Sequence, residues 1–445
     1  MTTSSLATAE IEALLGRHPK GFDLSLERIR RLLTVLGDPH LRLPPTIHVA
    51  GTNGKGSVTA FSRAILEADG RAVHTHTSPH LVHWHERYRL ADPSGGGSQL
   101  VSDAVLAKAV RQAAAANDDQ PITVFEILTA VTFMLFAEYP ADIALVEVGL
   151  GGRFDATNVI ETPAVSVITA ISLDHQSFLG DRVELIAAEK GGIIKPGVPV
   201  VIGQQAEQVA LDVLTSIADR VGAPISVYGQ DFFAYEEHGR MVYQDDLGLL
   251  DLPLPRLPGR HQLTNAATAI AALRQSPFAP SDAAIEAGMT KVDWSGRMQR
   301  MTSGPLIDIV PEGAEIWLDG GHNPGAGVAI AETLADMEER VSRPLFLIVG
   351  MINTKEPVGF FSAFAGMARR VFTVPIGMSE SGIDPDELAD AAIEAGLDAE
   401  PCDSVEEAIH LISANWQAIV APRFVICGSL YLVGEVLGQT GLAPR

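Results

Sequence analysis

Apolar runs rich in valine and isoleucine alternate with alanine-rich amphipathic stretches over about the first half of the chain. The apolar runs predict buried strands at residues 46–50, 142–148, 164–171 and 198–202. The amphipathic stretches predict helices at residues 55–69, 102–116, 124–138, 183–191 and 206–221. Strands that are apolar on both faces and separated by helices are typical of a mostly parallel sheet covered by helices on both sides.

Three segments depart from this alternation. Residues 228–250 show a short alternation of aromatic and polar positions with glycine turns, which predicts a small antiparallel insertion. Residues 77–99 contain three consecutive glycines and residues 252–260 are rich in proline, so both predict loops.

After about residue 300 the alternation restarts. It predicts strands at residues 315–319, 344–350, 370–375 and 423–427, and helices at residues 326–339, 385–395, 405–414 and 430–437. We therefore expect an α/β protein with a doubly wound domain at residues 1–298, which carries the antiparallel insertion, and a smaller Rossmann-like α/β domain at residues 299–445. The cleft between two such domains is the expected ligand site.

Composition limits what the protein can bind. The 445 residues include 32 Lys and Arg against 55 Asp and Glu, a formal net charge of −23, which argues against nucleic acid or an anionic membrane as a partner. The same repulsion opposes a small anionic substrate, so its site has to be built from local cations, amide dipoles or a metal. Cys402 and Cys427 lack the spacing of a thiolate zinc site and are expected to be buried free thiols. With no leader-like or membrane-spanning pattern, we expect a cytoplasmic protein.

A glycine-rich loop follows the first predicted strand and reads GTNGKGS at residues 51–57. A strand, a glycine loop, a lysine and a hydroxyl residue at the start of a helix together suit a triphosphate. The loop departs from the strict phosphate-loop pattern because Val49 stands where its first glycine belongs and Gly56 separates Lys55 from Ser57. No Asn-Lys-x-Asp element for guanine is found, so adenine is favoured. The expected ATP-binding residues of this loop are Thr52, Asn53, Gly54, Lys55, Gly56 and Ser57.

Acidic and imidazole side chains stand where two predicted strands end. Glu147 closes one apolar strand, and Asp174 and His175 follow the next. A carboxylate in such a place is costly unless it is paired or bound to a metal, and strand ends of an open α/β sheet meet at the ligand. Magnesium held through one or two side chains and ATP oxygens fits this pattern, with strand-end capping or an ion pair as the alternative.

Five histidines gather in a short segment, His74, His76, His80, His83 and His85. Imidazoles would suit zinc, copper or nickel. No acidic or cysteine partner stands at a tight ligand spacing, however, and residues 74–76 look like alternation at the end of a strand. We therefore expect no dedicated transition-metal site there.

The motifs GTNGKGS, EVGLGGRFDATN at residues 147–158, LDH at 173–175 and EKGGI at 189–193 are similar to those of the Mur ligase superfamily, and closest to its folylpolyglutamate synthase and dihydrofolate synthase branch. The resemblance covers nearly the whole chain. It implies Mg²⁺ ligands at Ser57, Ser78, Glu147 and His175. It also implies a carbamylated Lys190 that orients metal and substrate, whereas the residue pattern alone predicts a lysine on the surface of a helix.

The resemblance also implies substrate-binding residues. The residues implied for pteroate or folate are Phe22, Asp23, Leu24, Thr123, Phe125, Glu126, Arg153, Phe154 and Asp155. Those implied for ATP are Asn265, Arg297 and Asp319, and His322 is implied to act in catalysis near the incoming glutamate. Without the resemblance, Phe125 is predicted in the core, Glu126 on a solvated helix and Asp319 as a helix cap. Residues 353–356 replace the family's Asp-Lys-Asp pattern, which leaves the role of Lys355 open.

The resemblance implies an ATP-dependent ligase that joins L-glutamate to dihydropteroate and to the glutamate tails of reduced folates through an acyl phosphate. The alternatives are a folylpolyglutamate synthase with that single activity, a peptidoglycan-precursor ligase of the same superfamily, and a non-catalytic nucleotide-binding regulator. The expected partners are therefore the small molecules ATP, L-glutamate and dihydropteroate or a reduced folate, with Mg²⁺ as cofactor, and the protein is expected to be a monomer.

Overall fold

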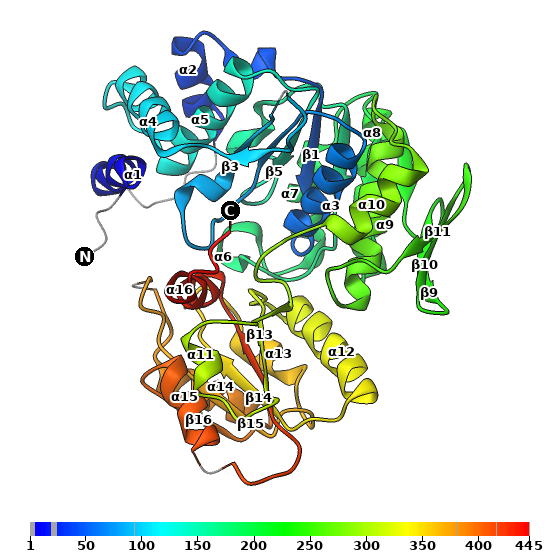
Figure 1. The fold of residues 1–445 in the computed structure, drawn as a ribbon. Helices are drawn as coiled ribbons and strands as arrows, with labels where there is room; N and C mark the ends of the chain where they lie inside the picture. The colour runs from blue at the N-terminus through cyan, green and yellow to red at the C-terminus, as the bar shows by residue number, and fades with distance from the viewer. Residues whose placement is uncertain (1–4, 19–24, 93, 380, 415, 445) are drawn as a thin grey trace.

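Two β-sheets, each covered by helices, organise the chain (Figure 1). The computed structural model describes residues 5–18, 25–92, 94–379, 381–414 and 416–444. We call the part built on the eight-stranded sheet the first lobe and the part built on the six-stranded sheet the second lobe. The fold class predicted from the sequence is confirmed.

The sheet of the first lobe has the strand order β4-β3-β2-β5-β1-β6-β7-β8, in which β3 pairs antiparallel with both β2 and β4 and all other pairs are parallel. Its strands are β1 (Thr46–Ala50), β2 (Val73–His76), β3 (Tyr88–Leu90), β4 (Gln99–Leu100), β5 (Ile143–Glu147), β6 (Val165–Ile168), β7 (Val200–Ile202) and β8 (Ile225–Val227). Strand β1 is buried at every position and pairs Val49 with Glu147 of β5 and with Val167 of β6. The carboxyl ends of these three strands therefore lie side by side.

Helices cover both faces of this sheet. They are α1 (Leu6–Arg17), α2 (Glu27–Val35), α3 (Lys55–Ala68), α4 (Asp103–Asn117), α5 (Val124–Glu138), α6 (Gln176–Leu179), α7 (Val183–Lys190), α8 (Gln208–Val221), α9 (Arg260–Gln275) and α10 (Asp282–Lys291), with 3-10 turns at Pro39–Arg42, Trp84–Arg87, Ala156–Val159 and Gly191–Ile193. One core forms under α3, α9 and α10 around Phe61, and another under α1, α2, α4 and α5 around Phe133. Burying each of these two rings stabilises the fold by about 2 kcal/mol.

A three-stranded antiparallel sheet packs beside α9, as the sequence predicts for residues 228–250 (Figure 1). Its strands are β9 (Phe233–Glu237), β10 (Arg240–Asp245) and β11 (Gly248–Pro253). Arg274 of α9 donates to both carboxylate oxygens of Asp245, at 2.6 and 2.7 Å, which fixes the insertion to the lobe. Strand β11 continues to Pro253, so the loop predicted at residues 252–260 begins later.

The sheet of the second lobe has the order β12-β13-β17-β14-β15-β16, with only β12 antiparallel. Its strands are β12 (Gln299–Arg300), β13 (Glu315–Leu318), β14 (Leu345–Val349), β15 (Arg370–Thr373), β16 (Ala399–Pro401) and β17 (Arg423–Cys427). Its helices are α11 (Pro305–Asp308), α12 (Pro324–Arg340), α13 (Pro357–Ser362), α14 (Pro385–Glu394), α15 (Val405–Ser413) and α16 (Leu430–Thr440). Cys402 and Cys427 are buried free thiols, as predicted.

The expected loop at residues 77–99 is partly wrong, because it contains the turn Trp84–Arg87 and the strand β3. Strand β3 is short and half-buried, and it lies near the sheet edge where apolar patterning is weak. The domain boundary at 298/299 stays a prediction. Within the described ranges, no helix is both long and apolar enough to cross a membrane.

Candidate active site

The loop at residues 51–57 leaves β1 and begins α3 through two glycines with positive φ, Gly51 at 148° and Gly54 at 91°. Other residues rarely adopt such angles. A Cβ at Gly54 would also collide with the side chain of Asn265 on α9. Gly54 is the N-cap of α3 and provides no capping side chain, so the first amides of the helix can serve an anionic ligand.

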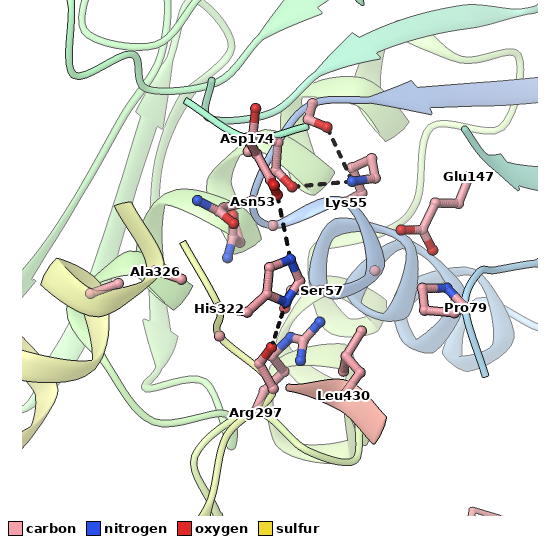
Figure 2. Close-up of a pocket in the computed structure, with 18 of the residues that line it drawn as sticks. Asn53, Lys55, Ser57, Pro79, Glu147, Asp174, Arg297, His322, Ala326 and Leu430 are labelled. Carbon is pink, nitrogen blue, oxygen red and sulfur yellow. Dashed lines mark hydrogen bonds and ion pairs between the residues drawn. The ribbon is translucent and has the colours of Figure 1, made fainter. Parts of the chain in front are cut away.

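The amine of Lys55 folds back over this loop. It donates to the carbonyl oxygens of Gly51 and Thr52, each at 3.1 Å (Figure 2). These bonds hold a positive charge at the mouth of the loop, and no described acidic residue forms an ion pair with it. An incoming phosphate can replace them by a stronger, charge-assisted contact.

The sequence-predicted catalytic, nucleotide and metal residues line one pocket between the lobes (Figure 2). The lining includes Thr52, Asn53, Gly54, Lys55, Gly56, Ser57, Ser78, Glu147, His175, Lys190, Asn265, Arg297, Asp319 and His322. The predicted convergence of the strand ends on the glycine loop is therefore confirmed as geometry. The role of each residue stays a prediction.

Glu147 and Ser78 present oxygen atoms to this pocket. Glu147 is 5% exposed, and from the described residues it accepts only a long bond, from the Ser78 amide at 3.3 Å. Burial raises the pKa of Glu147 to about 7, against the nearby charge of Lys55. The Ser78 hydroxyl is buried without a hydrogen-bond partner. An orphaned hydroxyl beside a poorly solvated carboxylate fits a hard divalent cation.

Protein side chains alone do not complete a metal site here. Among the described residues, no three His, Cys, Asp or Glu side chains are grouped to hold a metal ion. Burial lowers the pKa of His175 to about 4, so its imidazole is neutral near pH 7 and can serve as a ligand. The donor set therefore fits a cation that takes its remaining ligands from ATP oxygens and water.

Lys190 ends α7 beneath the glycine loop and is 5% exposed, so the surface position indicated by the residue pattern is wrong. Its amine donates to the carbonyl oxygen of Gly51 at 2.8 Å. Burial, and next the charge of Lys55, lower the pKa of Lys190 to about 7. A neutral amine is available to CO₂ under ordinary conditions, which the carbamate hypothesis requires.

Asp319 joins two loops of the second lobe. Its carboxylate accepts the backbone amides of Met298 at 2.8 Å and Gly321 at 2.7 Å. It is therefore no helix cap, since the N-cap of α12 is Asn323. The bond to Met298 positions the adjacent Arg297, whose guanidinium lines the pocket and donates to Gly296 O at 2.9 Å.

A polar cluster that the sequence reasoning did not assign connects the lobes. Asp174 accepts from Lys355 at 2.6 Å and from Asn323 at 3.0 Å. Its carboxylate also lies 3.4 Å from His322 Nε2 (Figure 2). Asn323 also exchanges two bonds of 3.0 Å with Asn53 of the glycine loop. Burial opposes ionisation, but the bond from His322 and the charge of Lys355 hold the pKa of Asp174 well below its usual range.

The sequence carried partial signals for this cluster. Asp174 precedes His175 at a strand end, and Asn323 follows His322 directly. Their pairing joins residues 149 positions apart, on separate sheets, and no local pattern encodes such a contact. Lys355 appeared only as a departure from a family motif.

The pteroate elements meet on the α5 side of the first lobe, apart from Phe22, Asp23 and Leu24, which lie outside the described residues. Thr123 and Glu126 form a capping box that starts α5. Glu126 is 4% exposed and pairs with Arg28 at 3.1 Å, so it is not the solvated residue that the helix pattern alone indicates. Its second oxygen is buried and unpartnered. Phe125 packs against Gly149.

The loop after β5 carries the other three pteroate candidates. Phe154 is 40% exposed, and the guanidinium of Arg153 lies 3.8 Å from Glu189. Asp155 is buried, and its two oxygens accept the amides of Gly149 and Leu150 and both donors of Thr157, the hydroxyl at 2.5 Å. In this structure Asp155 shapes the loop, while the two exposed side chains are available to a ligand.

The clustered histidines have separate partners. His74 stacks on Phe136 with ring centroids 4.7 Å apart. His76 contacts Thr132 at 2.9 Å, and Nδ1 of His80 accepts from Arg87 at 3.0 Å. Each ring therefore supports local structure.

Two family descriptions cover most of the chain. The "Mur ligase middle domain" matches residues 49–273, and the "Mur ligase, glutamate ligase domain" matches residues 296–429. The chain is 33% identical over 428 residues to the folylpolyglutamate synthase of Lacticaseibacillus casei, covering 92% of each chain. It is 35% identical over 411 residues to the dihydrofolate synthase/folylpolyglutamate synthase of Mycobacterium tuberculosis, covering 86% of this chain and 81% of the relative.

Solved structures agree with these relatives. Escherichia coli FolC in complex with DHPP and ADP superposes with a TM-score of 0.84 at 29% identity, covering 98% of this chain and 97% of that one. The bifunctional folylpolyglutamate synthase/dihydrofolate synthase of Yersinia pestis, complexed with AMPPNP and Mn ion, gives 0.83 at 31% identity, with 98% of both chains covered.

Proposed function

This chain belongs to the Mur ligase family and is an ATP-dependent ligase of its dihydrofolate synthase/folylpolyglutamate synthase branch, and from that premise we propose its substrates and the roles of its residues. It joins L-glutamate to dihydropteroate, and then to the glutamate tails of reduced folates. The observation that carries this proposal is the convergence of Lys55, Glu147, Lys190 and His322 in one pocket between the lobes. Residues 1–298 bind ATP and the acceptor, and residues 299–445 bring glutamate.

The first step activates the acceptor's carboxylate. One carboxylate oxygen attacks the γ-phosphorus in line, the bond to the β–γ bridging oxygen breaks, and ADP leaves with that electron pair. Lys55, Arg297 and the loop amides at residues 52–57 neutralise the phosphate charge. Asn265, held at 3.1 Å by Gln262 and packed on Gly54, is placed to read the adenine side.

Glu147, Ser78, His175 and Ser57 would hold Mg²⁺ together with ATP oxygens. When bound, it supplies Lewis-acid stabilisation of the charge that develops on the phosphates. The buried, unpartnered Ser78 hydroxyl and the raised pKa of Glu147 support this assignment, because both groups gain a partner from a cation.

The second step forms the amide. The amine of glutamate attacks the acyl carbon and phosphate leaves from the anhydride. His322 lies beside the pocket with its Nδ1 at 3.0 Å from Gly320 O, which fixes the ring so that it can position glutamate. Lys190, if carbamylated, would add an anion beneath the glycine loop that orients metal and substrate.

The acceptor's pterin and aminobenzoate rings lie against α5 and the loop after β5. Phe125 and the exposed Phe154 offer apolar faces, and Arg153 offers a cation for a carboxylate. The unpartnered oxygen of Glu126 suits an amino donor of the pterin. Thr123 and Asp155 position these groups, and Phe22, Asp23 and Leu24 complete the proposed site.

Acceptor dependence tests this function. Glutamate-dependent ADP formation is measured at fixed ATP with dihydropteroate and with tetrahydrofolate as acceptors. Activity with both supports the bifunctional enzyme. Activity with tetrahydrofolate alone indicates a single-function folylpolyglutamate synthase, and no glutamate- and acceptor-dependent turnover would refute the proposal.

We also propose a monomer that works on small molecules in the cytoplasm. The net charge of −23 disfavours a polyanion partner. Light scattering in solution should give a mass near 47.3 kDa. A mass twice as large would contradict the monomer without touching the activity.

A further inference from the structure

The segment at residues 353–356 follows β14 and opens α13. Two residues of this segment form hydrogen bonds within the second lobe. The Asn353 amide donates to Ser381 O at 2.8 Å, and Glu356 caps α13 by accepting from the Gly359 amide at 2.9 Å. The side chain of Lys355 instead leaves its own lobe. It is 3% exposed and donates to Asp174 Oδ1 of the first lobe at 2.6 Å.

The Asp174 carboxylate thus contacts several groups from across the lobe interface. Asp174 Oδ1 accepts from Lys355 and from the His175 amide at 2.8 Å. Asp174 Oδ2 accepts from Asn323 at 3.0 Å and lies 3.4 Å from His322 Nε2. Three of these donors belong to second-lobe loops after β13 and β14. Asp174 itself adjoins His175 in the pocket.

Among the groups that contact Asp174, Lys355 forms the strongest interaction because it carries a positive charge. Asp174 is 7% exposed, so its carboxylate has little water to solvate it. Removing a buried cation leaves its partner's charge uncompensated, and the interface then gains by opening to water. Asn323 brings a dipole only, so it cannot replace the charge of Lys355.

We propose that Lys355 is a positioning residue that ties the second lobe to Asp174, so that His322 stays over the reaction centre and water stays out while the acyl phosphate exists. The inference rests on the proposed ligase chemistry. Where the lobes part, water attacks the anhydride, the carboxylate is restored and phosphate is released. ATP is then consumed without an amide bond.

The test compares ADP with amide product. The wild-type enzyme, given ATP, Mg²⁺, glutamate and tetrahydrofolate, should form both in equal amounts. For Lys355→Met we expect kcat for amide formation to fall about 100-fold, because the reacting groups are misplaced, with a several-fold excess of ADP over amide. Asp174→Asn should behave alike, and the double variant should be no worse than either single one.

Two further variants separate positioning from folding. Lys355→Arg keeps the charge and should restore most of the coupling between ADP and amide. Arg370→Met is the matched control, because Arg370 pairs with Asp398 at 3.2 Å at the far edge of the second-lobe sheet and should stay coupled. Circular dichroism checks that each variant is folded. If Lys355→Met does not fold, the arginine and asparagine variants still decide the matter.

A readout without turnover completes the design. With AMPPNP and Mg²⁺ bound, Lys355→Met should be cleaved faster by trypsin in the connection at residues 294–304 than the wild type. Equal amounts of ADP and amide in Lys355→Met, with wild-type cleavage, would overturn the inference and leave the ligase function intact. A wild-type enzyme that forms no amide would instead refute the ligase proposal.

Discussion

Lys55 contributes charge to the pocket but little to the fold. It is half-buried, and both of its hydrogen bonds run to its own loop. We expect Lys55→Met to lower kcat for amide formation by about 100-fold or more, because a cation that faces the transferring phosphoryl group is lost. Unfolding temperature should change little. Lys291→Met, at the exposed end of α10, is the control, and near wild-type turnover in Lys55→Met would contradict the role.

Glu147 illustrates the conflict between stability and function. Its pKa of about 7 lies above the ordinary value of 4.5, so the native state binds more protons than the unfolded state between these pH values, and stability falls as pH rises through this range. In metal-free buffer, Glu147→Gln should therefore be more stable than the wild type by about 3 kcal/mol at pH 8, with a smaller difference at pH 5.

The same variant should be almost inactive. Urea unfolding at the two pH values measures the first effect, and the Mg²⁺ dependence of turnover measures the second. A stability difference that is equal at pH 5 and pH 8 would show that Glu147 is not the buried ionising group. Preserved Mg²⁺-dependent turnover would remove it from the proposed ligands.

The carbamate hypothesis predicts that the amine of Lys190 reacts with CO₂. Its pKa of about 7 lies below the ordinary 10.5, so the fraction of Lys190 with a neutral, nucleophilic amine increases as the pH rises through 7. Bicarbonate labelled with ¹³C should give a carbamate signal at pH 8 that is weaker at pH 6 and absent in Lys190→Ala. Short carboxylic acids should restore part of the activity of that variant. Full activity of Lys190→Ala without them would exclude the carbamate role.

At the scale of elements, the site depends on where a strand stops and a helix starts. The register of β1 with β5 places Val49 opposite Glu147, so the glycine loop and the carboxylate leave the sheet together. The loop also needs the backbone that only glycine allows easily. These two conditions make the join of β1 and α3 the most sensitive element of the site.

Gly54→Ala tests this join. Its φ of 91° and the collision of a Cβ with Asn265 should lower stability by about 1–2 kcal/mol and weaken ATP binding strongly. Gly37→Ala is the matched control, because Gly37 has a φ of 78° but open space around it. This variant should be less stable by about 1 kcal/mol and should keep its ATP affinity. Thermal unfolding and calorimetric titration with ATP measure the two effects. Unchanged ATP affinity in Gly54→Ala would contradict the role of the loop.

The elements that the sequence predicted best are those whose patterns are local. Strands β1 and β17 and helix α5 begin and end where predicted, because apolar runs and the Thr123–Glu126 box mark them. The strand β2 reads Val-His-Thr-His, and it confirms the expectation that residues 74–76 end a strand, although no apolar run marks where the strand begins. Its histidines are buried only because α5 and neighbouring backbone groups supply partners, such as Thr132 for His76.

At the scale of the whole molecule, the acidic surface and the cationic pocket are compatible. The chain carries −23 overall, yet Lys55 and Arg297 both line the pocket between the lobes. Coulomb energy falls with distance and with screening, so these two half-buried cations dominate the local potential. The lobes meet through Asp174, whose partners come from both sheets.

Neighbours along the chain are enough to predict the α/β class, the glycine loop and the strand-end Glu147 and His175. The packing of the two sheets sets which distant groups meet. The fold buries Lys190 beneath Gly51 and joins Lys355 to Asp174. It also leaves both carboxylate oxygens of Asp155 hydrogen-bonded to amides of its own loop. These contacts depend on how two separately patterned sheets pack, and no local periodicity records that packing.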